Sequence, residues 1–366
     1  IDQTIQWLIR EMLDDSGGFY AALHADSEGE EGKFYVWTFN EIKELAGEHS
    51  SLIATYYDIR EKGNWDSTNI PRITRNEIDI AAQFEMDLIT LRSIITQFKQ
   101  RALSKRAERI RPGRDNKIIS GWNGLTLTGI LEAYQATGKT DYLKLAKKNY
   151  RYILKNLIIN GTLIHIANLS TQGFAEDYAA IIQALIKYYE TTFNENALQI
   201  ANDLTLQMNK QYYDPQERLF YFTSIRAENL IARKNDFFDN VIPSSNSLMA
   251  ENLLKLGLLL DNESYKKQSL DMVDHIGELI VQEISYLSQW ASVANLLVKP
   301  IPEIVIFGNN YLKLAKELNA LNIPLKVVAA SSKKSDLPLL RNKTEIDGKT
   351  GIYVCYNKVC KLPSTD

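Results

Sequence analysis

The stretch that decides the fold runs from residue 121 to residue 164 and reads GWNGLTLTGILEAYQATGKTDYLKLAKKNYRYILKNLIINGTLI. Its apolar side chains first recur at the three- and four-residue spacing of one helix face. They are Leu125, Leu127, Ile130, Leu131 and Tyr134. Gly138 can end this helix, and Asp141 then opens a second helix. A connection this short makes the two helices antiparallel, which predicts a helical hairpin.

The same period marks helices along most of the chain. They are expected over residues 2–13, 87–107, 121–137, 140–157, 176–191, 195–210, 245–260, 263–280 and 282–297. A turn and a short aromatic or apolar strand follow some of the pairs, at residues 15–20, 160–164 and 214–221. Helix pairs joined by such turns predict a mainly α fold, an (α/α)6-type toroid that this chain could leave incomplete. An open array of hairpins is the alternative.

The period changes at Pro300 and Pro302. A strand at 303–307, a helix at 311–321 and strands at 325–330 and 351–355 predict a small C-terminal β-α-β-β segment. We therefore expect a toroid domain at 1–299, with an insertion at about 40–115, and a small α/β unit at 300–366.

Bulk properties exclude several classes of function. The 366 residues carry a net charge of −3, which gives no electrostatic case for nucleic acid or an anionic membrane as a partner. No apolar run approaches the roughly 20 residues of a spanning helix. The chain has only two cysteines, which is too few for a disulfide scaffold and favours a reducing, cytoplasmic compartment. We expect Cys355 and Cys360 to be one buried strand thiol and one loop thiol. The chain enters a helical pattern without a starting Met, so we expect it to begin inside a larger protein.

Carboxylates gather first in the segment Ala25–Gly32, which reads ADSEGEEG and precedes an expected strand at 33–37. Such a loop could hold a general acid, a sugar hydroxyl or a cation, although its spacing is not that of an EF-hand. A solvated hairpin loop is the alternative. His24 and Asp26 border the strand rather than the loop tip, which keeps both interpretations open.

Three further polar clusters lie where helices are expected to begin. They contain Trp122 and Asn123, then Glu176, Asp177 and Tyr178, then Asp239, Ser244, Ser245 and Asn246. Helix capping and the helix dipole explain some of these residues. In a toroid, however, the turns lie at one end of the ring. Asp26, Asp177 and Asp239 are therefore candidate catalytic acids.

The remaining polar residues of these segments are candidate substrate-binding groups. They are His24, Trp122, Asn123, Glu176, Tyr178, Ser244, Ser245 and Asn246. Carboxylates beside an aromatic platform suit a small carbohydrate, which would be bound or transformed by acid–base chemistry. A two-histidine, epimerase-like mechanism through His24 and His165 is a weaker alternative. A non-enzymatic interaction module is another.

Other chemistries lack their motifs. Gly138-Lys139-Thr140 is not a phosphate-binding loop, because Ala133 stands where that loop requires Gly. No HExxH, GxSxG or GxGxxG occurs, and the two cysteines lack a second pair of ligands for zinc. We expect neither a cofactor nor a metal.

Five motifs together resemble one known family. They are GGFYAALHADSEGEEGKFYVW, RPGRDNKIISGWNG, FAEDYA, DNVIPSSNS and IYVCYNKVCKLP. In this order they resemble the thioredoxin-domain-containing YyaL-like proteins, which include spermatogenesis-associated relatives. The resemblance implies a large domain similar to six-hairpin glycosidases and N-acylglucosamine 2-epimerases. It also implies that a thioredoxin-like domain and the first hairpins are missing here. His24 departs from the family pattern, where an acid is usual.

Overall fold

The chain divides into two compact units. The structure is a computed structural model that describes residues 1–227, 232–321, 323 and 326–365. Unit 1 comprises residues 1–21 and 117–366, and unit 2 comprises residues 22–116. The insertion expected at about 40–115 falls inside unit 2, and the expected α/β segment 300–366 falls inside unit 1.

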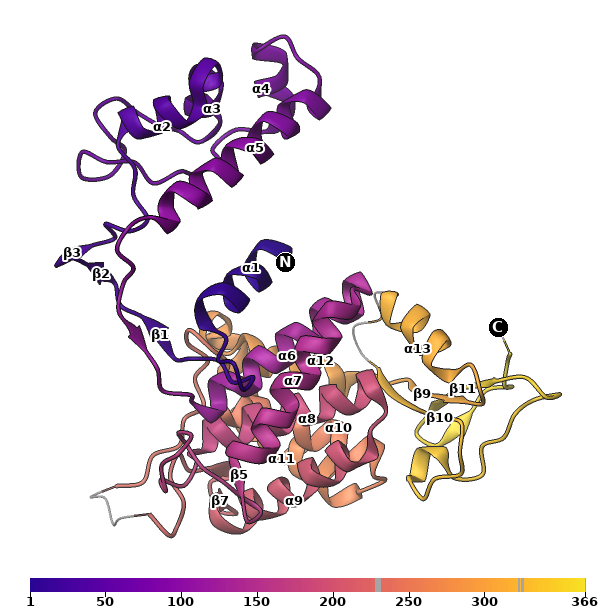
Figure 1. The fold of residues 1–366 in the computed structure, drawn as a ribbon. Coiled ribbons are helices and arrows are strands. Elements are labelled where there is room, and N and C mark those ends of the chain that lie inside the picture. Colours follow the sequence, from indigo (N-terminus) through magenta and orange to yellow (C-terminus); the bar gives the residue numbers. More distant parts are fainter. Residues whose placement is uncertain (228–231, 322, 324–325, 366) are drawn as a thin grey trace. The chain divides into compact units, whose positions relative to one another are not determined.

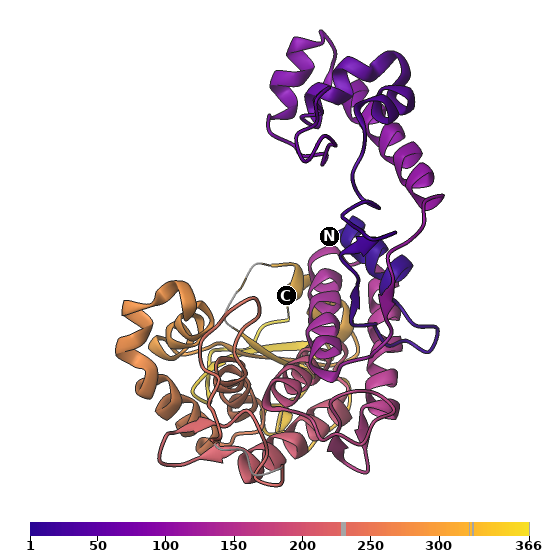
Figure 2. The ribbon, with the colours of Figure 1, turned by 90° about the vertical axis from the view of Figure 1, so that its left-hand side faces the viewer.

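Unit 1 consists mainly of helical hairpins (Figure 1). In chain order its helices are α1 (Asp2–Trp7), the π-helix η1 (Leu8–Met12), α6 (Ser120–Thr137), α7 (Thr140–Asn156), α8 (Ala175–Thr192), α9 (Glu195–Gln211), α10 (Ser245–Leu259), α11 (Glu263–Gln282), the 3₁₀ helix η3 (Ile284–Tyr286) and α12 (Ser288–Val298). Helices α6, α8, α10 and α12 pack side by side as an inner layer, and α7, α9 and α11 pack against α6, α8 and α10. Figure 2 shows the hairpins following one another in an arc, from magenta to orange. The predicted mainly α toroid fold is confirmed.

Helix α8 lies in the middle of the inner layer, and its contacts with α6, α9 and α10 bury almost every face of it. Ala179, Ala180 and Ala184 are buried small residues that let its neighbours approach closely. A Cβ atom added to Gly124 of α6 would lie 2.7 Å from the backbone C and O atoms of Ala180. On the other side, Asn252 of α10 donates a hydrogen bond to the carbonyl of Ala179 at 2.9 Å.

Short strands connect the hairpins of unit 1. Strands β5 (Ile158–Ile159) and β6 (Thr162–Leu163) pair antiparallel, as do β7 (Tyr213–Asp214) and β8 (Leu219–Phe220). Near the N-terminus, Leu13 and Phe19 form an isolated antiparallel bridge. These elements lie within or beside the three turn-and-strand segments that the sequence predicts.

A four-stranded sheet follows the hairpins in unit 1. Its elements are β9 (Glu303–Phe307), α13 (Tyr311–Ala320), β10 (Val327–Ser331), the 3₁₀ helix η4 (Pro338–Leu340), β11 (Gly351–Tyr356) and β12 (Val359–Cys360). The strand order is β10-β9-β11-β12, with β9 parallel to β10 and antiparallel to β11. Leu325, the second residue before β10, was expected to be part of this strand and lies outside the described residues.

The sheet packs near the C-terminal end of α8, where the Val328 amide donates to Glu190 Oε1 at 3.3 Å. Glu190 and Asp177 are 13 positions apart in this helix, which corresponds to about 20 Å along its axis. The sheet and the polar residues at the start of α8 therefore lie at opposite ends of the helical layer.

The expectation of two separate thiols is wrong. Cys355 and Cys360 form a disulfide between β11 and β12. The two residues face each other across a tight hairpin, a relationship that sequence spacing alone had not indicated. The reducing compartment, which was expected from the low number of cysteines, stays a prediction.

Unit 2 has a hydrophobic core of its own. Its elements are β1 (Ala22–Leu23), β2 (Asp26–Ser27), β3 (Glu30–Glu31), α2 (Phe39–Ala46), the 3₁₀ helix η2 (Gly47–His49), α3 (Ser50–Tyr56), α4 (Glu77–Gln83), α5 (Leu88–Ala107) and β4 (Arg114–Asp115). Ile53, Ile80 and Leu91 are fully buried in its core. The expected strand at 33–37 is wrong, because Gly32 starts a turn and only Trp37 pairs, with Asn69. No described helix of either unit is both long enough and apolar enough to span a bilayer.

Candidate functional site

The N-terminal ends of α6 and α8 are joined through the buried carboxylate of Asp177. Its Oδ1 accepts a hydrogen bond from the Gly121 amide at 2.7 Å. Its Oδ2 accepts one from the Phe174 amide at 2.8 Å and lies 2.7 Å from His165 Nδ1. The hydrogen bond to Asp177 raises the pKa of His165, while partial burial opposes this effect. Asp177 thus caps its own helix, α8, and also binds the first turn of the neighbouring helix α6.

Asp239 plays the corresponding part between α10 and α12. Its Oδ1 accepts hydrogen bonds from the Ser244 amide at 2.9 Å and from Ser247 Oγ at 2.7 Å. Its Oδ2 accepts one from the Gln289 amide at 2.8 Å. The carboxylates of Asp177 and Asp239 therefore make structural contacts, and their catalytic role stays a prediction.

Two asparagines fasten the short strands to the inner helices. Asn123 accepts a hydrogen bond from the Phe19 amide at 2.8 Å and donates one to the Phe19 carbonyl at 3.0 Å. Asn246 does the same with Phe220, at 2.7 and 2.9 Å. The two segments share a further contact, because the hydroxyls of Tyr20 and Tyr221 donate to Asp14 and Asp214, each at 2.6 Å. These segments are structural repeats, and the side-chain amide of each asparagine both accepts from and donates to the backbone of its segment.

Glu176 and Asp236 lie close in sequence to Asp177 and Asp239, and neither of the two carboxylates takes part in an ion pair among the described residues. Glu176 lies in the first turn of α8, and Asp236 lies in the loop before α10; both are partly buried. Burial raises the pKa of Glu176, and the charges of Asp177 and Asp236 raise it further, while His165 opposes them. Burial likewise raises the pKa of Asp236, a hydrogen bond with the Ser245 backbone opposes this, and the charge of Asp239 adds to it. Asp236 is thus close enough to Glu176 for its charge to raise the pKa of that carboxyl.

The other predicted ligand-binding residues of unit 1 differ in exposure. Trp122, next to Gly121 at the start of α6, is 44% exposed. Tyr178 is fully buried, and its ring lies 5.3 Å from that of Tyr212. Ser244 caps α10 by accepting a hydrogen bond from the Ser247 amide at 3.1 Å, and Ser245 beside it is buried. Direct contact of these buried side chains with a ligand stays a prediction.

Asp26 and His24 belong to unit 2, and both are exposed. Asp26 pairs with Glu31 in the β2–β3 hairpin, so the acidic segment is a tight surface hairpin. Other residues of this hairpin line a cavity of about 630 Å³ in unit 2, together with Trp65 and Arg109. Lys33 forms ion pairs with Glu28 and Glu30, at 3.6 and 2.8 Å, at this cavity.

Sequence reasoning identified the segment that begins at Asp236 but did not select this residue, and it gave His165 only a minor role. The signal for Asp236 was present, because the segment DFFDN carries two acids and one acid is enough to cap the following helix. No group of three or more His, Cys, Asp or Glu side chains among the described residues is arranged to hold a metal ion.

Comparison with solved structures gives limited overlap. A cellobiose 2-epimerase from Bacillus thermoamylovorans superposes with a TM-score of 0.36 at 17% identity, covering 43% of this chain and 44% of the other. A GH76 α-mannanase of Bacteroides thetaiotaomicron gives 0.41 at 15% identity, covering 63% and 66%. A sugar epimerase from a ruminal bacterium gives 0.40 at 13% identity, covering 75% and 68%.

Comparison with curated sequences gives longer matches, although no family model matches the chain. An uncharacterised protein of Caenorhabditis elegans, B0495.5, is 29% identical over 74% of this chain and 41% of its own length. Spermatogenesis-associated protein 20 of Homo sapiens is 25% identical over 99% of this chain and 52% of its own length. The chain spans about half the length of the curated relatives that it matches. As its five motifs predict, the chain is similar along almost its entire length to spermatogenesis-associated protein 20.

Proposed function

We propose that unit 1 binds a small neutral carbohydrate at the N-terminal ends of its inner helices and transforms it by general acid–base chemistry, with Glu176 and Asp236 as the acid–base pair. The observation that carries this proposal is the proximity of two partly buried carboxyls from different elements, where the charge of Asp236 raises the pKa of Glu176. Acid–base catalysis on sugars needs one carboxyl that keeps its proton near neutral pH and one that gives it up.

The surroundings of the pair support this class of ligand. Trp122 offers an exposed indole, the kind of flat apolar surface on which a sugar ring stacks. The clustered carboxylates would repel a phosphorylated or otherwise anionic ligand, so a neutral sugar fits better. His165, held by Asp177, is a further proton-carrying group near Glu176.

To test this proposal, the full chain is mixed with each member of a panel of neutral mono- and oligosaccharides. Binding is followed by calorimetry, and chemical change by chromatography and NMR. Glu176→Gln and Asp236→Asn are expected to keep binding but to lose turnover by about a hundredfold or more, since general acid–base groups contribute that much. Trp122→Ala is expected to weaken binding by about tenfold, because it removes buried apolar contact.

Glu278→Gln is the matched control, since Glu278 is an exposed residue on α11. The carbohydrate proposal fails if no sugar in the panel binds. If a sugar binds but is not changed, the acid–base part fails and a binding module remains. A loss of turnover in the control variant would also count against the assignment to Glu176 and Asp236.

A further inference from the structure

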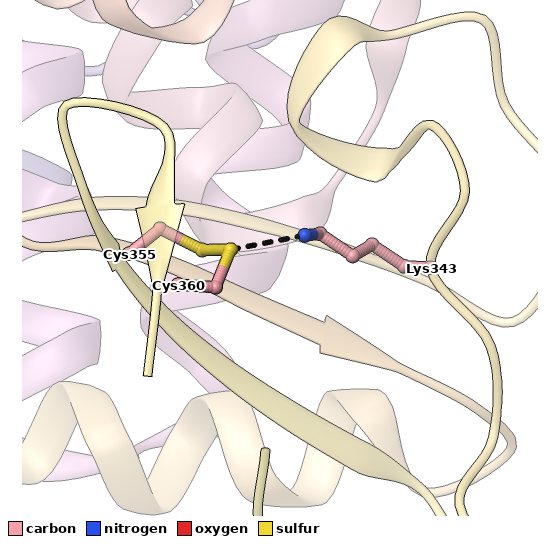
Figure 3. The surroundings of a disulfide bond; sticks show 3 residues. All are labelled: Lys343, Cys355 and Cys360. Atoms are coloured by element: carbon pink, nitrogen blue, oxygen red, sulfur yellow. Dashed lines mark hydrogen bonds between the residues drawn. A yellow bond between two sulfur atoms is a disulfide. The ribbon is translucent and has the colours of Figure 1, made fainter. Parts of the chain in front are cut away.

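The disulfide Cys355–Cys360 lies at the end of the sheet in a hairpin that brings its two residues face to face (Figure 3). The turn residues Asn357 and Lys358 both have positive φ, 47° and 69°, as in a two-residue type I′ turn. The Lys361 amide donates to the Val354 carbonyl at 2.9 Å. The cysteines therefore occupy the non-hydrogen-bonded pair, where side chains come closest.

The two sulfur-bearing residues differ sharply in access. Cys355 is 3% exposed, whereas Cys360 is exposed on β12, the edge strand of the sheet. Val359 and Leu362 on either side of Cys360 are 75% and 94% exposed. Cys360 is therefore open to an incoming thiol, whereas Cys355 is shielded from solvent.

A lysine stands beside the accessible sulfur. Lys343 Nζ lies 3.2 Å from Cys360 Sγ, as Figure 3 shows. A nearby cation stabilises a thiolate relative to the thiol, and so favours Cys360 both as a nucleophile and as a leaving group.

A buried carboxyl stands opposite the inaccessible cysteine. Glu303 of β9 is the direct cross-strand partner of Cys355, so the two side chains point to the same face of the sheet. Glu303 is 3% exposed, and its Oε2 has no hydrogen-bond partner among the described residues. Burial raises the pKa of this carboxyl. Both cysteines, Glu303 and Lys343 line one cavity of about 160 Å³.

We propose that Cys355–Cys360 is a thiol–disulfide exchange site that takes two electrons from a dithiol. One thiolate of the dithiol attacks Cys360 Sγ, the Cys355–Cys360 bond breaks, and Cys355 leaves as a thiolate that takes a proton from Glu303. The second thiol of the dithiol loses its proton to solvent, and its thiolate attacks the dithiol sulfur that is bonded to Cys360, which releases Cys360 as a thiolate beside Lys343. The dithiol becomes a cyclic disulfide, and the chain is left with the Cys355 thiol and the Cys360 thiolate.

The first experiment asks whether exchange occurs in the folded chain. The full chain is treated with dithiothreitol at pH 7 without denaturant, and thiols are counted by mass spectrometry after alkylation. Two alkylated cysteines per chain are expected, together with an unchanged circular dichroism spectrum and re-formation of the bond with oxidised dithiothreitol. A disulfide that yields thiols only after unfolding is a purely structural one and overturns the proposal.

The second experiment tests the assigned roles in the Cys355→Ser chain, where Cys360 is the only thiol. Its alkylation by iodoacetamide is measured against pH. Lys343→Met is expected to lower the rate at pH 7 by roughly tenfold, because the thiolate loses its neighbouring cation. Lys334→Met, at an exposed lysine elsewhere in unit 1, is the control and should change nothing.

The companion Cys360→Ser chain leaves only the buried Cys355, whose alkylation should be at least tenfold slower. Should the Cys355→Ser chain fail to fold, the reduced parent chain gives the same comparison, since mass spectrometry resolves the two cysteines. Equal reactivity of both cysteines, or no effect of Lys343→Met, would overturn the assigned roles.

Discussion

His165 Nδ1 lies 2.7 Å from Asp177 Oδ2, and this contact fastens the loop after β6 to the first turn of α8. The hydrogen bond to Asp177 raises the pKa of His165, with burial acting in the opposite direction. The imidazolium is therefore favoured in the folded chain. Its contribution to stability is fully present below the ordinary histidine pKa of about 6.5 and is lost as pH rises through the raised pKa.

This pair predicts a specific pH dependence of stability. Between pH 5.5 and pH 9, the parent chain should lose more unfolding free energy than the His165→Asn variant, because only the parent has the raised pKa. Urea unfolding at several pH values measures this difference. His275→Asn, at an exposed position of α11, is the control and should follow the parent. Parallel curves for parent and His165→Asn would contradict the prediction.

The hydrogen bonds between Asn246 and the backbone of Phe220 predict that removing this side chain causes a large loss of stability. Replacing Asn246 with Ala leaves the buried amide and carbonyl of Phe220 without their partners, which we expect to cost about 3 kcal/mol. Urea unfolding monitored by fluorescence measures the loss. Asn309→Ala, at an exposed residue after β9, should lie within about 0.5 kcal/mol of the parent. A small effect of Asn246→Ala would show that water or another group replaces the side chain.

Two glycines of α6 give a paired prediction of opposite sign. Gly124→Ala should destabilise unit 1 by about 2 kcal/mol, because the new Cβ would lie 2.7 Å from the backbone of Ala180. Gly129→Ala should stabilise it by up to about 1 kcal/mol, because nothing lies within 4 Å of the new Cβ and Ala favours the helix. Thermal unfolding compares the two. A shift of the same sign in both variants would contradict the close contact between α6 and α8.

Glu176 predicts a stabilising substitution. Because burial and two carboxylates raise its pKa, ionising Glu176 is less favourable in the fold than in the unfolded chain. This penalty is present above the raised pKa and absent below the ordinary value of about 4.3. Glu176→Gln should therefore raise the unfolding free energy at pH 7 but not at pH 4, whereas Glu278→Gln should do neither. Equal effects at both pH values would remove the electrostatic explanation.

Much of unit 1 follows from sequence period alone. Helices α6 to α11 are long and carry an apolar face, and Gly138 ends α6 in a left-handed conformation, with φ of 68°, as its position predicted. Unit 2 was harder to predict, because α2, α3 and α4 have only 8, 7 and 7 residues. Helices that short have too few turns to show a period, and their stability comes from tertiary packing around residues such as Ile53.

For the candidate site, the sequence indicated the segments better than the individual residues. The sequence singled out the segments where α6, α8 and α10 begin, yet it could not tell which acid of each pair binds a neighbouring helix. Asp177 and Asp239 bind backbone amides of neighbouring helices, and those amides are brought near only by the fold. Their neighbours Glu176 and Asp236 are left partly buried. The disulfide was missed for a similar reason, since the turn at Asn357 and Lys358 sets which residues face each other.

Ala22 and Asp115 are paired across β1 and β4, so unit 2 begins and ends on adjacent strands. The chain therefore leaves and re-enters unit 1 through a narrow double-stranded stem. A segment whose first and last residues are paired can become longer, shorter or be exchanged during evolution without altering the path of the helices before and after it. The reason is that the chain enters and leaves the segment at neighbouring positions. The stem makes residues 22–116 a cassette, and its replacement by a short linker is a natural way to obtain the helical unit by itself.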